Sequence, residues 1–196
     1  MAFFPYEICA ALCYNFAIGG VWCGISEGLK MYQAGDWVVY GIQGVCHVVG
    51  TEKQLVNRKR MQYLVLEPLA QPESRFYLPV DNPTAMAKLQ PVLSQEQLEQ
   101  LLSSEQVRRD VWIAEENLRK QHYREMIGSG DREVLMQIVY TLHRHKASQL
   151  VAGKKFHQSD ENFLRDAEKL LSSEIALTMS LSAEAARDYL RRMLAE

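Results

Sequence analysis

The sequence predicts an α+β protein with two domains: a small antiparallel β-barrel comes first, and an all-α helical domain follows. Short runs of β-branched and aromatic residues, separated by glycine and proline, occupy residues 31–91. From residue 92 onward, leucines and other apolar residues recur at helical spacing instead. We therefore expect a barrel domain over residues 31–91, a helical domain over residues 92–196, and an N-terminal extension over residues 1–30.

The overall charge limits the classes of function. The 196 residues carry a formal net charge of -2, and 47% of them are hydrophobic, as in an ordinary globular protein. This balance excludes a uniformly basic nucleic-acid binder but leaves room for a local basic patch. The four cysteines are not spaced as metal ligands. We expect reduced thiols, no metal, no cofactor and a cytoplasmic location.

Residues 1–30 are apolar but do not resemble a targeting segment. Lys30 is their only basic residue, whereas a signal peptide begins with a basic region. Pro5, Glu7 and Asn15 interrupt the apolar run and make it a poor membrane span. Because Met31 directly precedes the organised pattern, we interpret it as the true start, with residues 1–30 upstream of it. The alternative is a small packed hairpin or helix.

Residues 35–49 predict a bent antiparallel pair of strands. Val38, Val39 and Tyr40 favour a strand, and residues 45–49 favour another. Gly41 and Gly44 lie between them and permit the backbone angles of a tight turn or bulge. This stretch therefore forms the opening of the barrel.

The remaining strands follow after a polar segment. Residues 53–60 are expected to be a polar connection, residues 61–66 a central strand, and residues 75–78 a further strand that ends at Pro79. Four or five short strands in so short a region fit an SH3-like or Tudor-like barrel, which is a common binding scaffold.

The helical domain has recognisable helix ends. Ser94 and Gln97 fit a capping box at the first helix. We expect a second helix over residues 105–127, ended by the glycines of residues 128–130, and a third helix capped by Asp131. A fourth helix begins near residues 159–161, and the last covers residues 182–194. The predicted inner faces of the last three helices are Val134, Leu135, Ile138, Val139 and Leu142, then Phe163, Ala167, Leu170, Leu171 and Ile175, then Ala186, Leu190 and Leu194.

Trp112 stands off the buried side of the predicted second helix. Helical spacing places Val107, Val111, Ala114 and Leu118 on the buried side. The same spacing places Trp112 on a face with Arg108, Arg109, Arg119 and Tyr123. Such a ring can simply pack against arginines through cation–π contacts. It can also enter a DNA groove while the arginines bind phosphates.

A basic segment lies further along the helical domain. Residues 140–158 contain Arg144, Lys146, Lys154 and Lys155 with three histidines and no acid. Over residues 92–196, however, 15 bases are balanced by 17 acids. The segment fits a phosphate contact, or a solvated helix end whose bases complement the helix dipole.

Patterns of catalytic residues are scarce, and we expect no enzyme. Cys46 and His47 are adjacent in a predicted strand, so their side chains point to opposite faces. His143 and His145 are two residues apart on a helix, which separates them in the same way. Neither pair forms a nucleophile and base or a metal site.

The order of these parts resembles the CarD family of bacterial transcription regulators. The resemblance runs from Met31 to the C-terminus and rests on the glycine-bounded strands of residues 35–49, on MQYLVLEPL and RFYLP, on SGD at residues 129–131, and on GKKFHQSDENFLRDAEKLLSSEIAL. It implies a barrel that binds the RNA polymerase β subunit, a helical domain that contacts promoter DNA at the upstream edge of the bubble, and stabilisation of the open complex.

The resemblance also implies roles for individual residues. Trp112 would be the minor-groove wedge, and Gln54, Leu55, Val56 and Tyr77 would contact the polymerase. The expected DNA contacts are Trp112, Arg108, Arg109, Arg119, Lys120, Tyr123, Arg124, Arg144, Lys154 and Lys155. We expect a monomer that binds DNA weakly alone, since attachment to polymerase raises its effective concentration. The alternative is a protein-interaction adaptor whose helical domain does not touch DNA.

Overall fold

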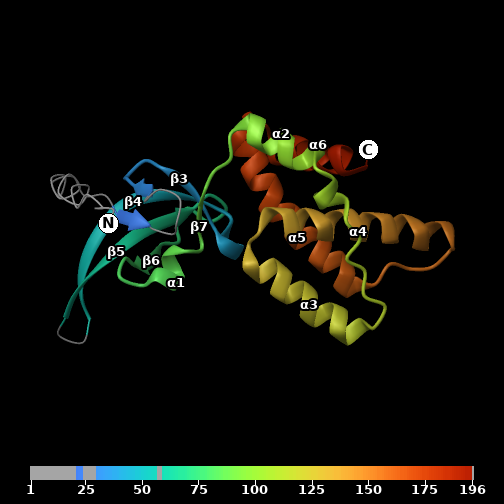
Figure 1. Ribbon diagram of the computed structural model, residues 1–196, viewed down its shortest axis with the longest axis horizontal. Helices are drawn as coiled ribbons and strands as arrows, with labels where there is room; N and C mark the ends of the chain where they lie inside the picture. The colour runs from blue at the N-terminus through green and yellow to red at the C-terminus, as the bar shows by residue number, and fades with distance from the viewer. Residues whose placement is uncertain (1–20, 24–29, 57–58, 196) are drawn as a thin grey trace, which may run out of the picture.

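A computed structural model describes residues 21–23, 30–56 and 59–195 of the chain (Figure 1). Most of residues 1–30 therefore lie outside the described residues, including most of the predicted extension. The short strand β1 (Val21–Cys23) pairs antiparallel with β2 (Lys30–Tyr32), and Met31 is opposite Trp22 in this pair. The interpretation of Met31 as the start stays a prediction.

The N-terminal part is a five-stranded antiparallel sheet in the order β6-β5-β4-β3-β7. Its strands are β3 (Trp37–Tyr40), β4 (Val45–Val56), β5 (Lys59–Pro68), β6 (Phe76–Pro79) and β7 (Leu89–Pro91). One face buries apolar side chains from β3, β4, β5 and β6, among them Val38, Cys46, Val48, Leu64 and Leu78. This arrangement confirms the predicted α+β class with a Tudor-like first domain.

The turn between β3 and β4 is formed as the glycines predict. Gly41 opens a short 3-10 turn, η1 (Gly41–Gln43), with a φ of 46°, and Gly44 follows it with a φ of 69°. The Tyr40 amide donates to the Gly44 carbonyl oxygen at 2.9 Å and closes the turn. Because positive φ is costly for residues with a side chain, glycine is required at both positions.

The predicted polar connection over residues 53–60 is wrong. Strand β4 continues to Val56 and β5 begins at Lys59, so these residues belong to one long hairpin. A register shift between Val48 and Gly50 bends β4 on the way. Residues near the end of a hairpin are solvated on both faces, so polar side chains are tolerated there. Cross-strand hydrogen bonds can therefore form a strand from this polar stretch. The short helix α1 (Pro83–Met86), capped by Asn82, was not predicted.

The helical part contains α2 (Gln95–Ser103), α3 (Glu116–Ser129), α4 (Arg132–Val151), α5 (Gln158–Met179) and α6 (Ala183–Ala195). Its predicted ends are confirmed: Ser94 and Gln97 form both bonds of a capping box, and Asp131 caps α4. Gly130 ends α3 with a φ of 68°. In the described part of the chain, no helix is long and apolar enough to cross a membrane.

The predicted helix over residues 105–127 is also wrong in its first half. A short 3-10 turn, η2 (Glu105–Arg108), is followed by an irregular segment over residues 109–115, and α3 begins only at Glu116. The Glu115 carboxylate accepts from the Asn117 and Leu118 amides and caps the helix there. Leu118, predicted to be buried, is 53% exposed, whereas Arg119 and Tyr123 are buried.

The two parts meet at a polar clamp centred on Arg132. Its guanidinium donates to both carboxylate oxygens of Glu174 and also to Gln90 and to the Pro91 carbonyl oxygen on β7. Glu174 in turn accepts from the Leu93 amide. The start of α4, the middle of α5 and the end of the sheet are thus tied together.

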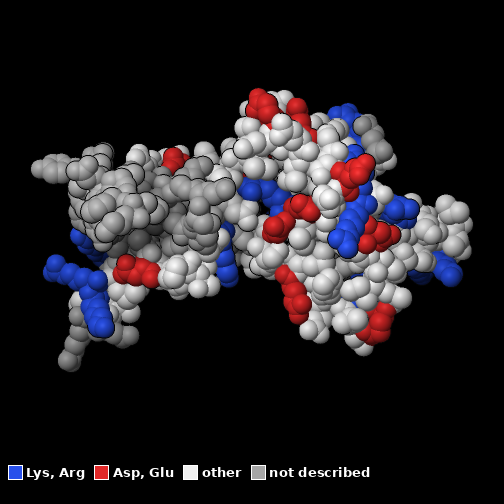
Figure 2. Space-filling model, in the orientation of Figure 1, with Lys and Arg blue, Asp and Glu red and all other residues white. Residues whose placement is uncertain are grey.

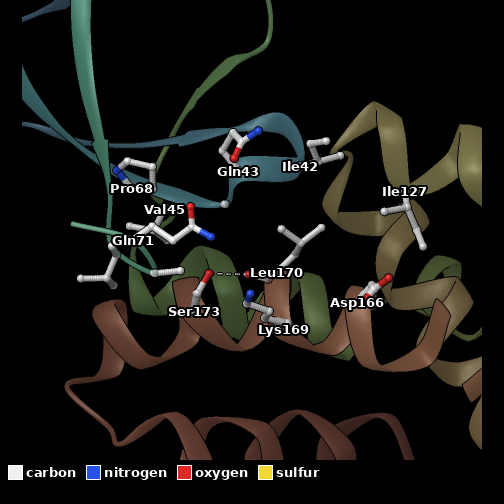
Figure 3. Close-up of a pocket in the computed structure, with 13 residues that line it drawn as sticks. Ile42, Gln43, Val45, Pro68, Gln71, Ile127, Asp166, Lys169, Leu170 and Ser173 are labelled. Carbon is white, nitrogen blue, oxygen red and sulfur yellow. Dashed lines mark hydrogen bonds between the residues drawn. The ribbon is translucent and has the colours of Figure 1, made fainter. Parts of the chain in front are cut away.

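A cavity of about 300 Å³ lies beside this junction (Figure 3). Residues of η1, β4 and β5 line one side, and Ile127 of α3 with residues of α5 line the other. Its only charged lining residues are Asp166 and Lys169, both exposed. It therefore marks the junction between the two parts more than a catalytic centre.

Candidate functional site

Trp112 lies on the irregular segment over residues 109–115, where side chains from two helices fix the backbone. The Val111 amide donates to the Thr141 hydroxyl of α4 at 2.9 Å, and the Tyr123 hydroxyl donates to the Val111 carbonyl oxygen at 3.4 Å. The Trp112 amide donates to the Asp110 carboxylate at 2.9 Å. These bonds replace those of a helix, so the segment is held in place without regular structure.

The indole ring of Trp112 is itself contacted by two side chains. The His145 imidazole stacks on it with ring centres 3.5 Å apart and planes 20° from parallel. The Arg119 guanidinium carbon lies 4.2 Å from the ring centre, in a cation–π contact. Both contacts are made to the face of the indole, which leaves its edge free of them.

Burial disfavours the charged form of the His145 ring beside Trp112. Desolvation is the main influence and lowers the pKa of His145 below its ordinary value of 6.5. The carboxylates of Asp160 and Asp110 raise it, and Arg119 lowers it further. A shallow cavity of about 230 Å³ opens next to the two rings and is also lined by Asp110, Arg144 and Ser148.

Arg119 and Tyr123 need a correction, because the structure buries both. Arg119 is 4% exposed and binds the Asp160 carboxylate through two nitrogens, at 3.0 and 3.1 Å. Its third nitrogen donates to the Ile113 carbonyl oxygen at 2.7 Å. Tyr123 has no exposed surface. Both residues support the Trp112 segment from the protein interior. Because they are buried, they cannot contact a phosphate in this conformation.

The other predicted basic contacts differ in their freedom. Arg108 donates to the carbonyl oxygens of Leu102, Ser104 and Met193, and Lys120 pairs with Glu116. Arg144 lies over the Tyr140 ring and lines the cavity beside Trp112. Among the predicted contacts, Arg109, Arg124, Arg144, Lys154 and Lys155 are exposed and form no ion pair with a described residue.

On one face of the molecule, the basic residues do not form one continuous surface (Figure 2). On the face shown in Figure 2, basic and acidic side chains are interspersed over the helices. The loop that carries Lys154 and Lys155 ends at His157, whose ring lies 3.6 Å from Glu116 at the start of α3. This brings the basic loop to the same end of α3 as the Trp112 segment.

The predicted polymerase contacts lie around the long hairpin. Strand β4 pairs with β5 over most of its length, but its pairing with β3 extends only as far as His47. Among the described residues, nothing pairs with the other edge of β4 from Gly50 onward. Gln54, Leu55 and Val56 therefore lie on a free strand edge.

The side chains of this set divide between the two faces of the sheet. Gln54 is opposite Met61, two residues before Tyr63, and Tyr77 is opposite Val65. Alternation along β5 places Gln54, Val56 and Tyr77 on one face and Leu55 on the other. Leu55 is 72% exposed and Tyr77 is 40% exposed. The backbone edge is the feature that the β4 residues share.

Cys46 lies in the core of the sheet, and His143 contacts a buried carboxylate. Burial raises the pKa of the Cys46 thiol to about 11, which keeps it protonated and unreactive. His143 lies 2.7 Å from the buried Glu168 and not beside His145. Within residues 21–23, 30–56 and 59–195, no cluster of three histidine, cysteine or acidic residues is arranged to hold a metal ion.

Comparison with known proteins finds matches to two family models. Residues 32–92 match the model described as CarD-like/TRCF RID domain, and residues 97–191 match the model described as CarD, C-terminal domain. No curated protein matches the chain. The two matched ranges correspond to the sheet and to the helices.

Proposed function

The chain belongs to the CarD family, a family of non-catalytic transcription factors that interact with RNA polymerase, and from this premise we propose its mode of action. Residues 31–91 bind the β subunit of the polymerase, and residues 92–196 contact promoter DNA at the upstream edge of the bubble. The contact stabilises the open complex. The protein acts as a monomer in the cytoplasm and needs no cofactor.

The observation that supports DNA contact best is the way Trp112 is displayed. The indole lies on a segment whose backbone bonds to side chains of α3 and α4, and its edge is free of the stacking contacts. An apolar side chain that enters a base step must be held rigidly, because the ordering would otherwise cost free energy on binding. Trp112 is therefore the proposed wedge.

Exposed bases of the helical part supply the proposed phosphate contacts. Arg109, Arg124, Arg144, Lys154 and Lys155 are exposed, and Arg108 and Lys120 are half-buried. The mixed charge of the helices predicts weak binding to DNA alone. Attachment to polymerase removes the need for high intrinsic affinity.

The free edge of β4 supports the proposed docking on polymerase. An unpaired strand edge offers amide and carbonyl groups to a strand of a partner. Gln54, Leu55 and Val56 lie on this edge, and Tyr77 adds an exposed ring on the neighbouring surface. The proposed contact is thus mainly through the backbone, with the side chains adding specificity.

The test is the lifetime of the open complex with Trp112→Ala. Loss of the wedge removes its contact with the unstacked bases, so we expect the half-life of the complex to fall about tenfold, with binding to the β subunit unchanged. Leu181→Ala, which truncates an exposed apolar side chain between α5 and α6, is the control and should leave the half-life unchanged.

An unchanged half-life with Trp112→Ala would contradict the wedge. The adaptor alternative predicts, in addition, that the footprint of polymerase near the bubble is the same with and without the protein. Failure of the unmodified protein to bind the β subunit would contradict the docking proposal itself.

A further inference from the structure

The orientation of the Trp112 ring depends on a residue far along the chain. The side chain of tryptophan has two rotatable bonds, and the backbone of residues 109–115 fixes only where these bonds begin. The ring then needs contacts of its own to hold one orientation. His145 on α4 supplies the closest of them, with ring centres 3.5 Å apart.

His145 is itself held in place from its own helix and from the following loop. The Gln149 side-chain amide lies 3.2 Å from His145 Nε2, one helical turn away. Donation from this amide requires an unprotonated Nε2, and hence a neutral imidazole with its proton on Nδ1. The Phe156 ring, tilted by 49° with its centre 6.4 Å away, packs near the imidazole.

We propose that His145 is a positioning residue for Trp112: stacking of the imidazole on the indole fixes the ring in the orientation that enters the DNA groove. This inference rests on the proposed function of Trp112. It assigns His145 no contact with DNA of its own. Arg119, fixed by Asp160, contacts the same indole and is a second support for the ring.

The expected effect of a substitution of His145 depends on whether a ring remains to stack on Trp112. In His145→Ala the indole loses one stacking contact and samples other rotamers, so we expect the half-life of the open complex to fall about threefold. In His145→Phe a flat ring remains, and the half-life should return close to that of the unmodified protein. His122→Ala, which removes an exposed histidine from α3, is the matched control and should have no effect.

A double-mutant cycle separates positioning from an independent DNA contact. If His145 acts through Trp112, His145→Ala has no further effect on the half-life once Trp112→Ala is present. If the two effects add, His145 touches DNA or polymerase itself, and the positioning role is overturned.

The fluorescence of Trp112 tests the positioning role without DNA. In a chain with Trp22→Phe and Trp37→Phe, Trp112 is the only tryptophan. We expect His145→Ala to lower the anisotropy of Trp112 emission and His145→Phe to restore it, while thermal unfolding followed by circular dichroism confirms that each variant is folded.

The two proposals fail in different ways. Unchanged anisotropy in folded His145→Ala would overturn the positioning role even if Trp112 is the wedge. An open complex insensitive to Trp112→Ala would overturn the wedge, while the lowered anisotropy would still establish that His145 orients the ring.

Discussion

Arg119 shows how the same side chain can be read as a DNA contact in the sequence and as a structural residue in the fold. Its guanidinium pairs with Asp160, whose side chain is as deeply buried as that of Arg119 itself. The same group donates to the Ile113 and Ala114 carbonyl oxygens beside Trp112. A buried pair of this kind is costly to break, because removal of one partner leaves the other charge unpaired.

The first prediction compares two arginines of α3. Arg119→Ala should lower the free energy of unfolding by about 3–5 kcal/mol, because Asp160 is left buried without its partner. Arg124→Ala removes an exposed guanidinium and should change the free energy of unfolding by less than about 0.5 kcal/mol. Urea unfolding measures both values.

For DNA binding, we expect the exposed Arg124 to matter although it contributes little to stability. At a temperature where both are folded, Arg124→Ala should still weaken DNA binding because a phosphate contact is lost. If Arg119→Ala proved as stable as Arg124→Ala, the buried ion pair would not have the importance that its geometry indicates.

Among the elements, α4, α5 and α6 are tied together by one carboxylate. Glu168 of α5 is 3% exposed, lies 2.7 Å from His143 of α4, and accepts two bonds from Arg191 of α6, at 2.7 and 2.8 Å. Burial alone would raise the pKa of Glu168. The hydrogen bonds and charges of His143 and Arg191 outweigh burial and lower it to about 2.

This shift predicts a dependence of stability on pH. Because the pKa is lower in the folded state, the stabilisation by Glu168 is complete above its ordinary value of 4.5 and is lost as the pH falls toward about 2. Glu168→Gln should cost about 2 kcal/mol at pH 7, and the difference from the unmodified protein should shrink at pH 3. Urea unfolding at both pH values measures the difference.

The control for this prediction is an acid of the same helix in an exposed pair. Glu161 binds Lys146, and its side chain is 43% exposed. Glu161→Gln should change the free energy of unfolding by less than about 1 kcal/mol at either pH. A cost for Glu168→Gln that is equal at pH 7 and pH 3 would show that the ionised carboxylate is not the source of the stabilisation.

For the whole molecule, the relation between the sheet and the helices depends on a close backbone contact. A Cβ atom placed on Gly130, at the end of α3, would lie 2.7 Å from the Gly41 Cα atom of η1. The Arg132 clamp to Glu174 and Pro91 lies on the same side of the junction. If the barrel docks on polymerase and Trp112 enters DNA as proposed, this junction sets where the two meet.

The prediction at this scale uses two glycines of one segment. Gly130→Ala should destabilise the protein by more than about 1 kcal/mol, since its φ of 68° and the contact with Gly41 both oppose a side chain. Gly128→Ala has open space around it and should be neutral or slightly stabilising in the last turn of α3. Thermal unfolding gives the comparison.

The same two variants test the transmission from polymerase to DNA. Gly130→Ala should keep its affinity for the β subunit but shorten the open-complex half-life, because the helices are displaced relative to the barrel. Gly128→Ala should match the unmodified protein in both measurements. Equal half-lives for the two variants would argue that the junction does not position the helices.

The sequence by itself determined the class of the fold and several element boundaries. Glycine at residues 41, 44 and 130, the capping box at Ser94, and the cap at Asp131 all act on their own neighbourhood, so local pattern was sufficient. The inner faces of the last three helices followed from spacing for the same reason, except that Val134 is only half-buried and lies outside the core.

Only the tertiary structure decided how Trp112 is displayed. The helical pattern of residues 105–115 does not produce an α-helix. Hydrogen bonds with the side chains of Thr141, Tyr123 and Arg119, which belong to α4 and α3, hold this backbone instead. The stacking of His145 on Trp112 and the pairing of Arg119 with Asp160 are likewise contacts between separate elements, and the free edge of β4 depends on where its pairing with β3 ends. Such contacts depend on how elements pack, and periodicity within one element carries no information about them.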